Sequence, residues 1–334
     1  MTDTTKPLRF LAWFAVTLAF CVVAFGAFVR LSNAGLSCPD WPTCYGKVTW
    51  PTHAAEIAAA NEAFPQRPVE TGKAWREQVH RFLAGGLILT TFALAALGWR
   101  RRRELAGLAA VPLGAALLIV FQALLGMWTV TWKLKPVVVM AHLLGGLATF
   151  ALLAHTALRL SVAPAGGGDA KPLRRMLIAG LVLVALQIAL GGWTSANYAA
   201  LACGTDFPIC LGQWWPAADF REAFVLWRGI GVNYEGGVLD AEARTAIQLV
   251  HRLGAVLVAG HLAACGLFAL RRGFGSFALA LLAALAAQIA LGIGNVKLGL
   301  PLPVATAHNG MAALLLFALL ALLVRSRPPT AVPS

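Results

Sequence analysis

Four of the seven histidines occupy matching places in the two halves of the chain, and their side chains are the ones most able to do chemistry. They are His80, His142, His251 and His308. His80 and His251 each lie in a VHR triplet, whereas His142 and His308 each follow an alanine within an apolar segment. Polar side chains inside membrane segments are costly and usually functional. Each half therefore offers two imidazoles, which suit iron, copper or zinc.

Heme iron fits two imidazoles better than a bare metal ion does. A structural zinc site needs four protein ligands, whereas heme needs only axial ligands, and its flat apolar ring fits between apolar helices. Glycines that follow the first pair of histidines would let such a ring approach the backbone: Gly85, Gly86, Gly145 and Gly146. Small residues are also ordinary at helix contacts in membranes, so the prediction depends on the histidines.

The other histidines lack this duplication. His155 and His261 lie deeper in apolar segments, but Ala321 and Thr90 stand at their equivalent positions. We therefore expect packing or hydrogen-bonding roles for both. His53 lies in a loop, and we expect it to be solvated.

Two arginines directly follow the first histidine of each half, and two roles stay open for them. Arg81 follows His80, and Arg252 follows His251. The guanidinium group matches a carboxylate, so both can bind heme propionates. The alternative is that both side chains reach lipid phosphates at the membrane surface.

The loops carry two local pairs of cysteines, in the segments CPDWPTC and CGTDFPIC. They are Cys38 with Cys44, and Cys203 with Cys210. We expect both loops on the oxidising side of a membrane, where disulfides form. Two disulfides are favoured over a metal site because no CxxC motif or nearby histidine completes one.

Membrane helices must position these residues. The chain of 334 residues is 59 % apolar and 12 % charged, with a mean hydropathy of +0.73. A hydrocarbon core of about 30 Å is crossed by about 20 apolar residues. Such runs predict eight spans: 10–30, 80–99, 107–130, 137–159, 174–195, 246–270, 276–297 and 303–324. The fold class is therefore an all-α membrane protein, with the duplicated histidines in the first two turns of their spans.

The charge pattern predicts how the spans are oriented. The net charge is +13, but the basic residues cluster at alternate ends of the spans rather than on one face, so we expect no nucleic-acid partner. Positively charged ends stay in the cytoplasm, which places both termini there. The two long loops, 31–79 and 196–245, then lie on the outer face, and the duplicated histidines lie near that face.

The two halves of the chain repeat one another. FQALLGMWTV at 121–130 matches AQIALGIGNV at 287–296, and VVVMAHLLGG at 137–146 matches PVATAHNGMA at 303–312. Such self-similarity predicts a tandem repeat. We expect an N-terminal four-helix bundle at 1–162, a cytoplasmic linker at 163–172 and a C-terminal four-helix bundle at 173–334. Small-residue helix faces also permit a homo-oligomer.

Together these features resemble the heme A synthase family over essentially the whole chain. The VHR spans, the four histidines, the duplicated bundle and the GLSCPDWPTCYG loop carry the resemblance. It implies an oxidoreductase that converts the C8 methyl of heme O to a formyl group by successive hydroxylations, giving heme A for terminal oxidases. It also implies that His251 and His308 bind heme b, whereas His80 and His142 flank the substrate heme.

The resemblance further implies an acidic catalytic residue three positions before the first histidine, which here is Glu77. The residues agree, because Gln248 stands at the equivalent position of the second half. One helical turn separates Glu77 from His80, so both can face one ring. A carboxyl there can move protons. The alternative is a carboxylate favoured by the helix dipole.

Two other functions would use the same ligands. A diheme membrane cytochrome b would only pass electrons, but such proteins stack their hemes across both leaflets, whereas these histidines lie near one face. A heme transporter or chaperone would bind heme without oxidising it. For the favoured function we expect a bacterial plasma (inner) membrane protein surrounded by lipid. Its heme O would come from a heme O synthase, and its electrons from an external donor.

Overall fold

In the part of the chain that the structure describes, eight helices are long and apolar enough to cross a membrane, which confirms the predicted spans. The computed structural model describes residues 5–105, 107–165 and 170–328, whose named elements are all helices. The spanning helices are α1 (Lys6–Leu31), α3 (Thr71–Arg100), α4 (Ala110–Thr131), α5 (Pro136–Ser161), α6 (Lys171–Ala196), α8 (Ala241–Arg271), α9 (Gly275–Lys297) and α10 (Leu302–Arg325). Proline in the first turn of α1, α5, α6 and α10 suits a helix start, where its missing N–H has no partner to lose.

Two short helices in the long loops were not predicted. They are α2 (Ala54–Ala63) and α7 (Phe220–Ala223). Neither is long enough to cross a membrane, so hydropathy gives no signal for them. The part of the predicted linker at 166–169 lies outside the described residues.

The helices α3 and α8 begin earlier than predicted, at Thr71 and Ala241. Hydropathy marks only the apolar part of a helix, but the polar turns before it are rich in Ala, Lys, Glu and Gln, which favour helix. Asp240 caps α8, because its carboxylate accepts a hydrogen bond from the N–H of Ala243 at 2.8 Å. His80 and His251 therefore lie beyond the second turn of their helices, and the expectation of the first two turns is wrong for them.

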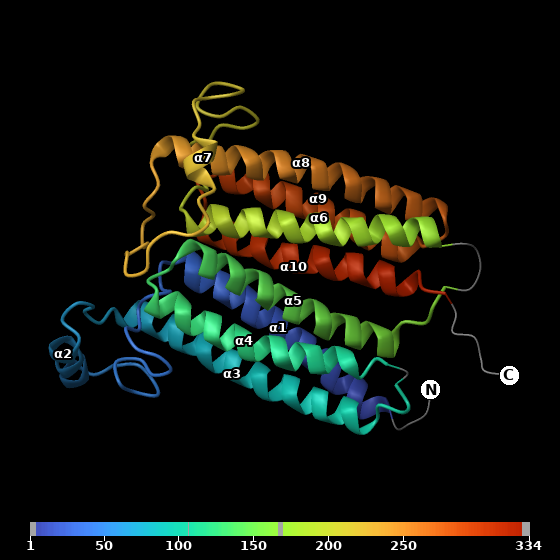
Figure 1. Ribbon diagram of the computed structural model, residues 1–334, viewed down its shortest axis with the longest axis horizontal. Helices are drawn as coiled ribbons and strands as arrows, with labels where there is room; N and C mark the ends of the chain where they lie inside the picture. The colour runs from blue at the N-terminus through green and yellow to red at the C-terminus, as the bar shows by residue number, and fades with distance from the viewer. Residues whose placement is uncertain (1–4, 106, 166–169, 329–334) are drawn as a thin grey trace.

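The spanning helices pack into two groups of four (Figure 1). In one group α1, α3, α4 and α5 form a closed ring in that order, and in the other α6, α8, α9 and α10 do the same. The groups meet where α1 packs on α10 and where α5 packs on α6 and α10. In each ring the two histidine-bearing helices are diagonal partners: α3 stands across from α5, and α8 across from α10.

The long loops gather at one end of the helices, opposite the start of α1 and the end of α10 (Figure 1). Both expected cysteine pairings are present there, Cys38–Cys44 and Cys203–Cys210, with S–S distances of 2.05 and 2.01 Å. The two disulfide loops fold alike. In each, an aspartate accepts a hydrogen bond at 2.8 Å from a glycine N–H, Asp40 from Gly46 and Asp206 from Gly212.

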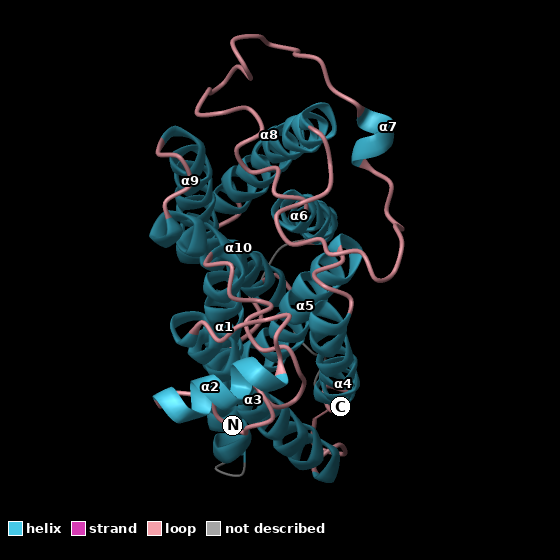
Figure 2. Cartoon of the chain, turned by 90° about the vertical axis from the view of Figure 1, so that its left-hand side faces the viewer, coloured by secondary structure: helices cyan, strands magenta, loops and turns pink. Residues whose placement is uncertain are grey.

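The segment after α7 crosses from the second group of helices to the first (Figure 2). Arg67, in the first long loop, donates two hydrogen bonds to the carboxylate of Glu235, at 2.8 and 3.0 Å. Tyr234 is fully buried, and its N–H donates to the turn between α4 and α5. The ammonium of Lys135 in that turn lies 3.2 Å from the ring centre of Trp227. These contacts fasten the second long loop onto the first group.

Candidate functional site

The four duplicated histidines form two pairs, one in each group of helices. His80 lies on α3 and His142 on α5, and the second pair, His251 and His308, lies on α8 and α10. All four side chains are half-buried. Each pair stands on helices that lie diagonally across a ring of apolar helices.

Each of the four imidazoles leans against a glycine of a neighbouring helix. The pairs, with the distance from a Cβ built on the glycine to the imidazole Cε1, are Gly26–His80 (2.8 Å), Gly126–His142 (3.4 Å), Gly191–His251 (3.3 Å) and Gly292–His308 (3.1 Å). We call these four glycines the glycine seats. A Cβ contact under 3.0 Å forces a neighbour to move, so a side chain at Gly26 would displace the imidazole of His80, whereas the other three contacts are less tight.

The glycines that the sequence singled out behave differently from the seats. A Cβ at Gly145 would lie 1.8 Å from the amide nitrogen of Gln122, so that side chain already covers this glycine. Gly85 has nothing within 4 Å of an added Cβ. The repeat alignment contains Gly126 and Gly292, but their contact with histidine is seen only in the structure.

Most of the duplicated histidines keep one buried ring nitrogen unpaired. The Nδ1 atoms of His80, His142 and His308 are buried and have no hydrogen-bond partner among the described residues. His251 differs, because its Nδ1 lies 3.1 Å from the amide nitrogen of Gln187. A buried polar atom without a partner is unfavourable. That these rings bind heme iron stays a prediction.

The arrangement suits heme rather than a bare metal ion. Among the described residues, no three or more His, Cys, Asp or Glu side chains are grouped to hold an ion. Heme iron needs only axial ligands from the protein, and the two imidazoles of a pair would supply them. Bundle cores are usual places for such cofactors. The residues present therefore fit a heme between each pair of histidines.

Glu77 is buried beneath the first disulfide loop, with 5 % of its surface exposed. One carboxylate oxygen accepts hydrogen bonds from the hydroxyl of Ser37 at 3.1 Å and the N–H of Cys38 at 2.9 Å. The other oxygen pairs with the guanidinium of Arg81. Gln248, its counterpart on α8, is also buried, and its Oε1 has no partner in the described part of the chain. The sequence predicted the Glu/Gln contrast but missed the contact with the disulfide loop.

The two arginines hold the disulfide loops, a role that neither sequence alternative included. Arg81 donates to the carbonyl oxygens of Asp40 at 2.9 Å and Thr43 at 2.6 Å. Arg252 donates to carbonyl oxygens of the second disulfide loop, twice at 2.9 Å. The signal for this contact was the equal placement of an arginine and a cysteine pair in both halves. Propionate binding by Arg81 and Arg252 stays a prediction.

The three histidines without a counterpart in the other half lie away from the two histidine pairs. The Nε2 atom of His261 lies 2.9 Å from the carbonyl oxygen of Met176, which confirms a hydrogen-bonding role. His155 is half-buried in α5, and His53 is exposed just before α2. None of the three is placed with the two histidine pairs.

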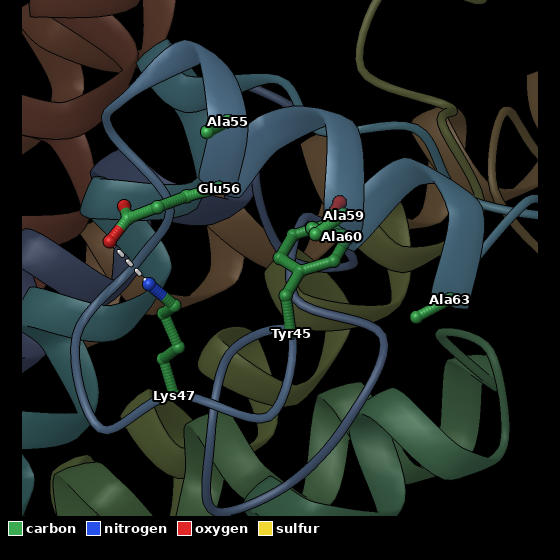
Figure 3. A pocket seen from close by; sticks show the side chains of 7 residues that line it. All are labelled: Tyr45, Lys47, Ala55, Glu56, Ala59, Ala60 and Ala63. Carbon is green, nitrogen blue, oxygen red and sulfur yellow. Dashed lines mark hydrogen bonds and ion pairs between the residues drawn. The ribbon is translucent and has the colours of Figure 1, made fainter.

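A cavity of about 410 Å³ lies in the first long loop, apart from the histidines. Figure 3 shows Tyr45 and Lys47 on one side of it and the alanines of α2 on the other. The ammonium of Lys47 forms an ion pair with Glu56, and this contact lowers the pKa of Glu56 to about 2. Since alanines make most of the wall, the cavity has few groups that could recognise a polar ligand.

Comparison with known proteins gives one consistent result. Residues 9–320 match the family model COX15-CtaA, described as cytochrome oxidase assembly protein. The chain is 44 % identical over 310 residues to a heme A synthase of Shewanella oneidensis, covering 91 % of this chain and 92 % of that one. It is 30 % identical over 327 residues to a heme A synthase of Rhizorhabdus wittichii (91 % and 89 % covered). It is 28 % identical over 356 residues to one of Caulobacter vibrioides (98 % of both covered).

Proposed function

This chain belongs to the COX15-CtaA family of cytochrome oxidase assembly proteins, and from that premise we propose that it acts as a heme A synthase. It is an oxidoreductase that converts the C8 methyl of heme O to a formyl group by successive hydroxylations. The product, heme A, serves terminal oxidases. The observation that carries the proposal is the presence of two histidine pairs on diagonal helices, with each imidazole in contact with a glycine seat.

The two groups of helices are tandem copies with different tasks. The C-terminal bundle, 173–334, holds heme b through His251 and His308. The N-terminal bundle, 1–162, receives heme O between His80 and His142. The difference in buried side chains supports this division, because only the N-terminal bundle has a carboxylate, Glu77, one turn before its first histidine. When bound, heme b supplies the one-electron chemistry that side chains lack.

The protein's own residues orient heme O and transfer the protons of the reaction. His80 and His142 fix the substrate iron between α3 and α5. Glu77 is the proton-carrying carboxyl of this bundle, and its bonds to the first disulfide loop hold it in place. Arg81 and Arg252 add positive charge for the heme propionates. The Nε of Arg252 is buried without a partner among the described residues, which supports a further contact there.

The orientation in the membrane follows from charge and redox chemistry. Basic residues cluster at the ends of the helices opposite the long loops, so these ends and both termini lie in the cytoplasm. The two disulfides require an oxidising compartment, which agrees with loops on the outer face of a bacterial plasma membrane. Heme O arrives from a heme O synthase, and an external donor supplies electrons.

The direct test is expression in a host that makes heme O but no heme A, followed by chromatography of the extracted hemes. We expect heme A to appear only when the protein is present. Glu77→Ala should keep spectroscopic heme b but stop the conversion, whereas His251→Ala should lose heme b. Gln248→Ala is the matched control for Glu77, since it removes the equivalent side chain from the other bundle.

The result also separates the alternative functions. A heme transporter or chaperone would bind heme O and release it unchanged, and a diheme cytochrome b would hold two b hemes without making heme A. Either outcome would overturn the proposed function. Full conversion by Glu77→Ala would overturn only the role given to Glu77.

A further inference from the structure

The two histidine pairs differ in what holds the first imidazole of each. Gln187 on α6 reaches His251: its amide nitrogen lies 3.1 Å from Nδ1 and 3.0 Å from the carbonyl oxygen of the same residue. In the other bundle the equivalent position on α1 is Val22, four residues before its glycine seat as Gln187 is before Gly191. Valine cannot form hydrogen bonds through its side chain, and the Nδ1 of His80 has no partner among the described residues.

A second difference accompanies the first. A Cβ at Gly254 would lie 2.3 Å from the Oε1 of Gln187, so the amide fits only because position 254 has no side chain. Gly254 stands three residues after His251, and the residue three positions after His80 is Leu83. The bundle with the amide thus has the space for it, and the bundle without the amide fills that space.

We propose that Gln187, which packs against Gly254, is a positioning residue that keeps heme b permanently bound in the C-terminal bundle. The absence of such a residue from the N-terminal bundle permits exchange of the heme there. The proposal rests on the proposed function, in which one bundle keeps heme b and the other must take up heme O and release heme A. An imidazole that is tethered through Nδ1 loses rotational freedom, so its Nε2 stays aimed at the iron. An imidazole without such a contact dissociates from the iron more readily.

The amide also has the chemistry that this task requires. A histidine that binds iron through Nε2 carries its hydrogen on Nδ1, and this N–H needs an acceptor. The Oε1 of Gln187 has no hydrogen-bond partner among the described residues. The amide would present it to Nδ1 by turning about its last bond, and this turn exchanges the contacts of the amide nitrogen with Nδ1 and with the carbonyl oxygen of His251 for one N–H···O bond from Nδ1. Such an acceptor raises the basicity of the ligand, and its loss typically weakens metal binding about 10–100-fold.

The first experiment compares heme b loss from purified holoprotein. Gln187→Met keeps the length of the side chain without the amide, and Gln187→Val copies the N-terminal bundle. With excess apomyoglobin as heme acceptor, we expect both variants to release heme b about 10–100 times faster than the unaltered protein. The midpoint potential of heme b should rise, because a less basic imidazole stabilises ferric iron less. Gly260→Ala, on the same helix with open space around it, should change neither quantity.

The reciprocal experiment installs the tether in the N-terminal bundle. Val22→Gln combined with Leu83→Gly should slow heme release from that bundle by a similar factor. Val22→Gln alone should have little effect, since Leu83 still fills the space that the amide needs. The protein must carry Glu77→Ala in this experiment, so that the bound heme O is not converted during the measurement.

The outcomes separate this inference from the proposed function. If Gln187→Met releases heme b at the original rate and potential, the tether is refuted, and continued production of heme A would leave the proposed function intact. A faster release with an unchanged midpoint potential would show mere loss of packing, and it would also overturn the tether. Protein that never acquires heme b would overturn the proposed function itself.

Discussion

The tightest glycine seat offers a sharp test of the substrate site. In Gly26→Ala the new methyl carbon would lie 2.8 Å from Cε1 of His80 and 3.2 Å from its Nε2. Carbon atoms reach favourable contact at about 3.5–4.0 Å, so the imidazole must retreat by at least about 0.7 Å. Misplacement of a reacting group by about 1 Å can cost about 10²-fold in rate. We therefore expect conversion of heme O to fall about 10–100-fold.

The assay is the ratio of heme A to heme O in extracts of cells that express each variant. Gly126→Ala is the matched comparison, since its methyl would lie 3.4 Å from Cε1 of His142, an ordinary contact, and we expect activity within about twofold. Gly72→Ala, with nothing within 4 Å, serves as a neutral control on α3. Heme b content should be unchanged in all three, because its ligands lie in the other bundle.

Two results would refute this reasoning. Conversion by Gly26→Ala at the original rate would show that the seat does not set the position of His80. Loss of heme b together with the activity would show that the substitution disturbs the whole membrane domain rather than one imidazole. The order of damage should also follow the four distances, so a large effect at Gly126 with none at Gly26 would contradict the geometry.

The remaining predictions concern the long loops. The half-exposed ion pair of Arg67 and Glu235 should show a coupling free energy of about 0.2–1 kcal/mol in a double-mutant cycle of alanine substitutions, measured by thermal unfolding in detergent. A coupling free energy of zero would show that this ion pair does not stabilise the packing of the two loops. Lys47 holds the pKa of Glu56 at about 2, below its usual 4.5, so the pair stabilises α2 above that usual value and fades as the pH falls toward 2. Between roughly pH 2.5 and 4, pepsin should therefore cleave residues 51–65 of Lys47→Met faster than the same residues of the unaltered protein. Equal cleavage of the two proteins would contradict this reasoning.

The amino-acid sequence by itself determined the elements and the chemistry. A chain in hydrocarbon must satisfy its backbone within each segment, so long apolar runs can only be helices, and all eight spans were readable from hydropathy. Duplication singled out four of the seven histidines, and the contrast between Glu77 and Gln248 distinguished the halves. Local spacing also predicted both disulfides, because each joins cysteines only six or seven residues apart.

Only the tertiary structure decided which helices meet and what each side chain touches. Gly26 and His80 are far apart in the chain, and nothing in either segment announces their contact, because it depends on how α1 and α3 are rotated when they pack. The same holds for Arg81, whose partners are backbone carbonyls of a distant loop, and for Gln187 beside His251. Apolar helix faces are nearly interchangeable in lipid, so their pairing is set by the close fit of small residues and hydrogen bonds between helices, a property of two surfaces together rather than of either segment alone.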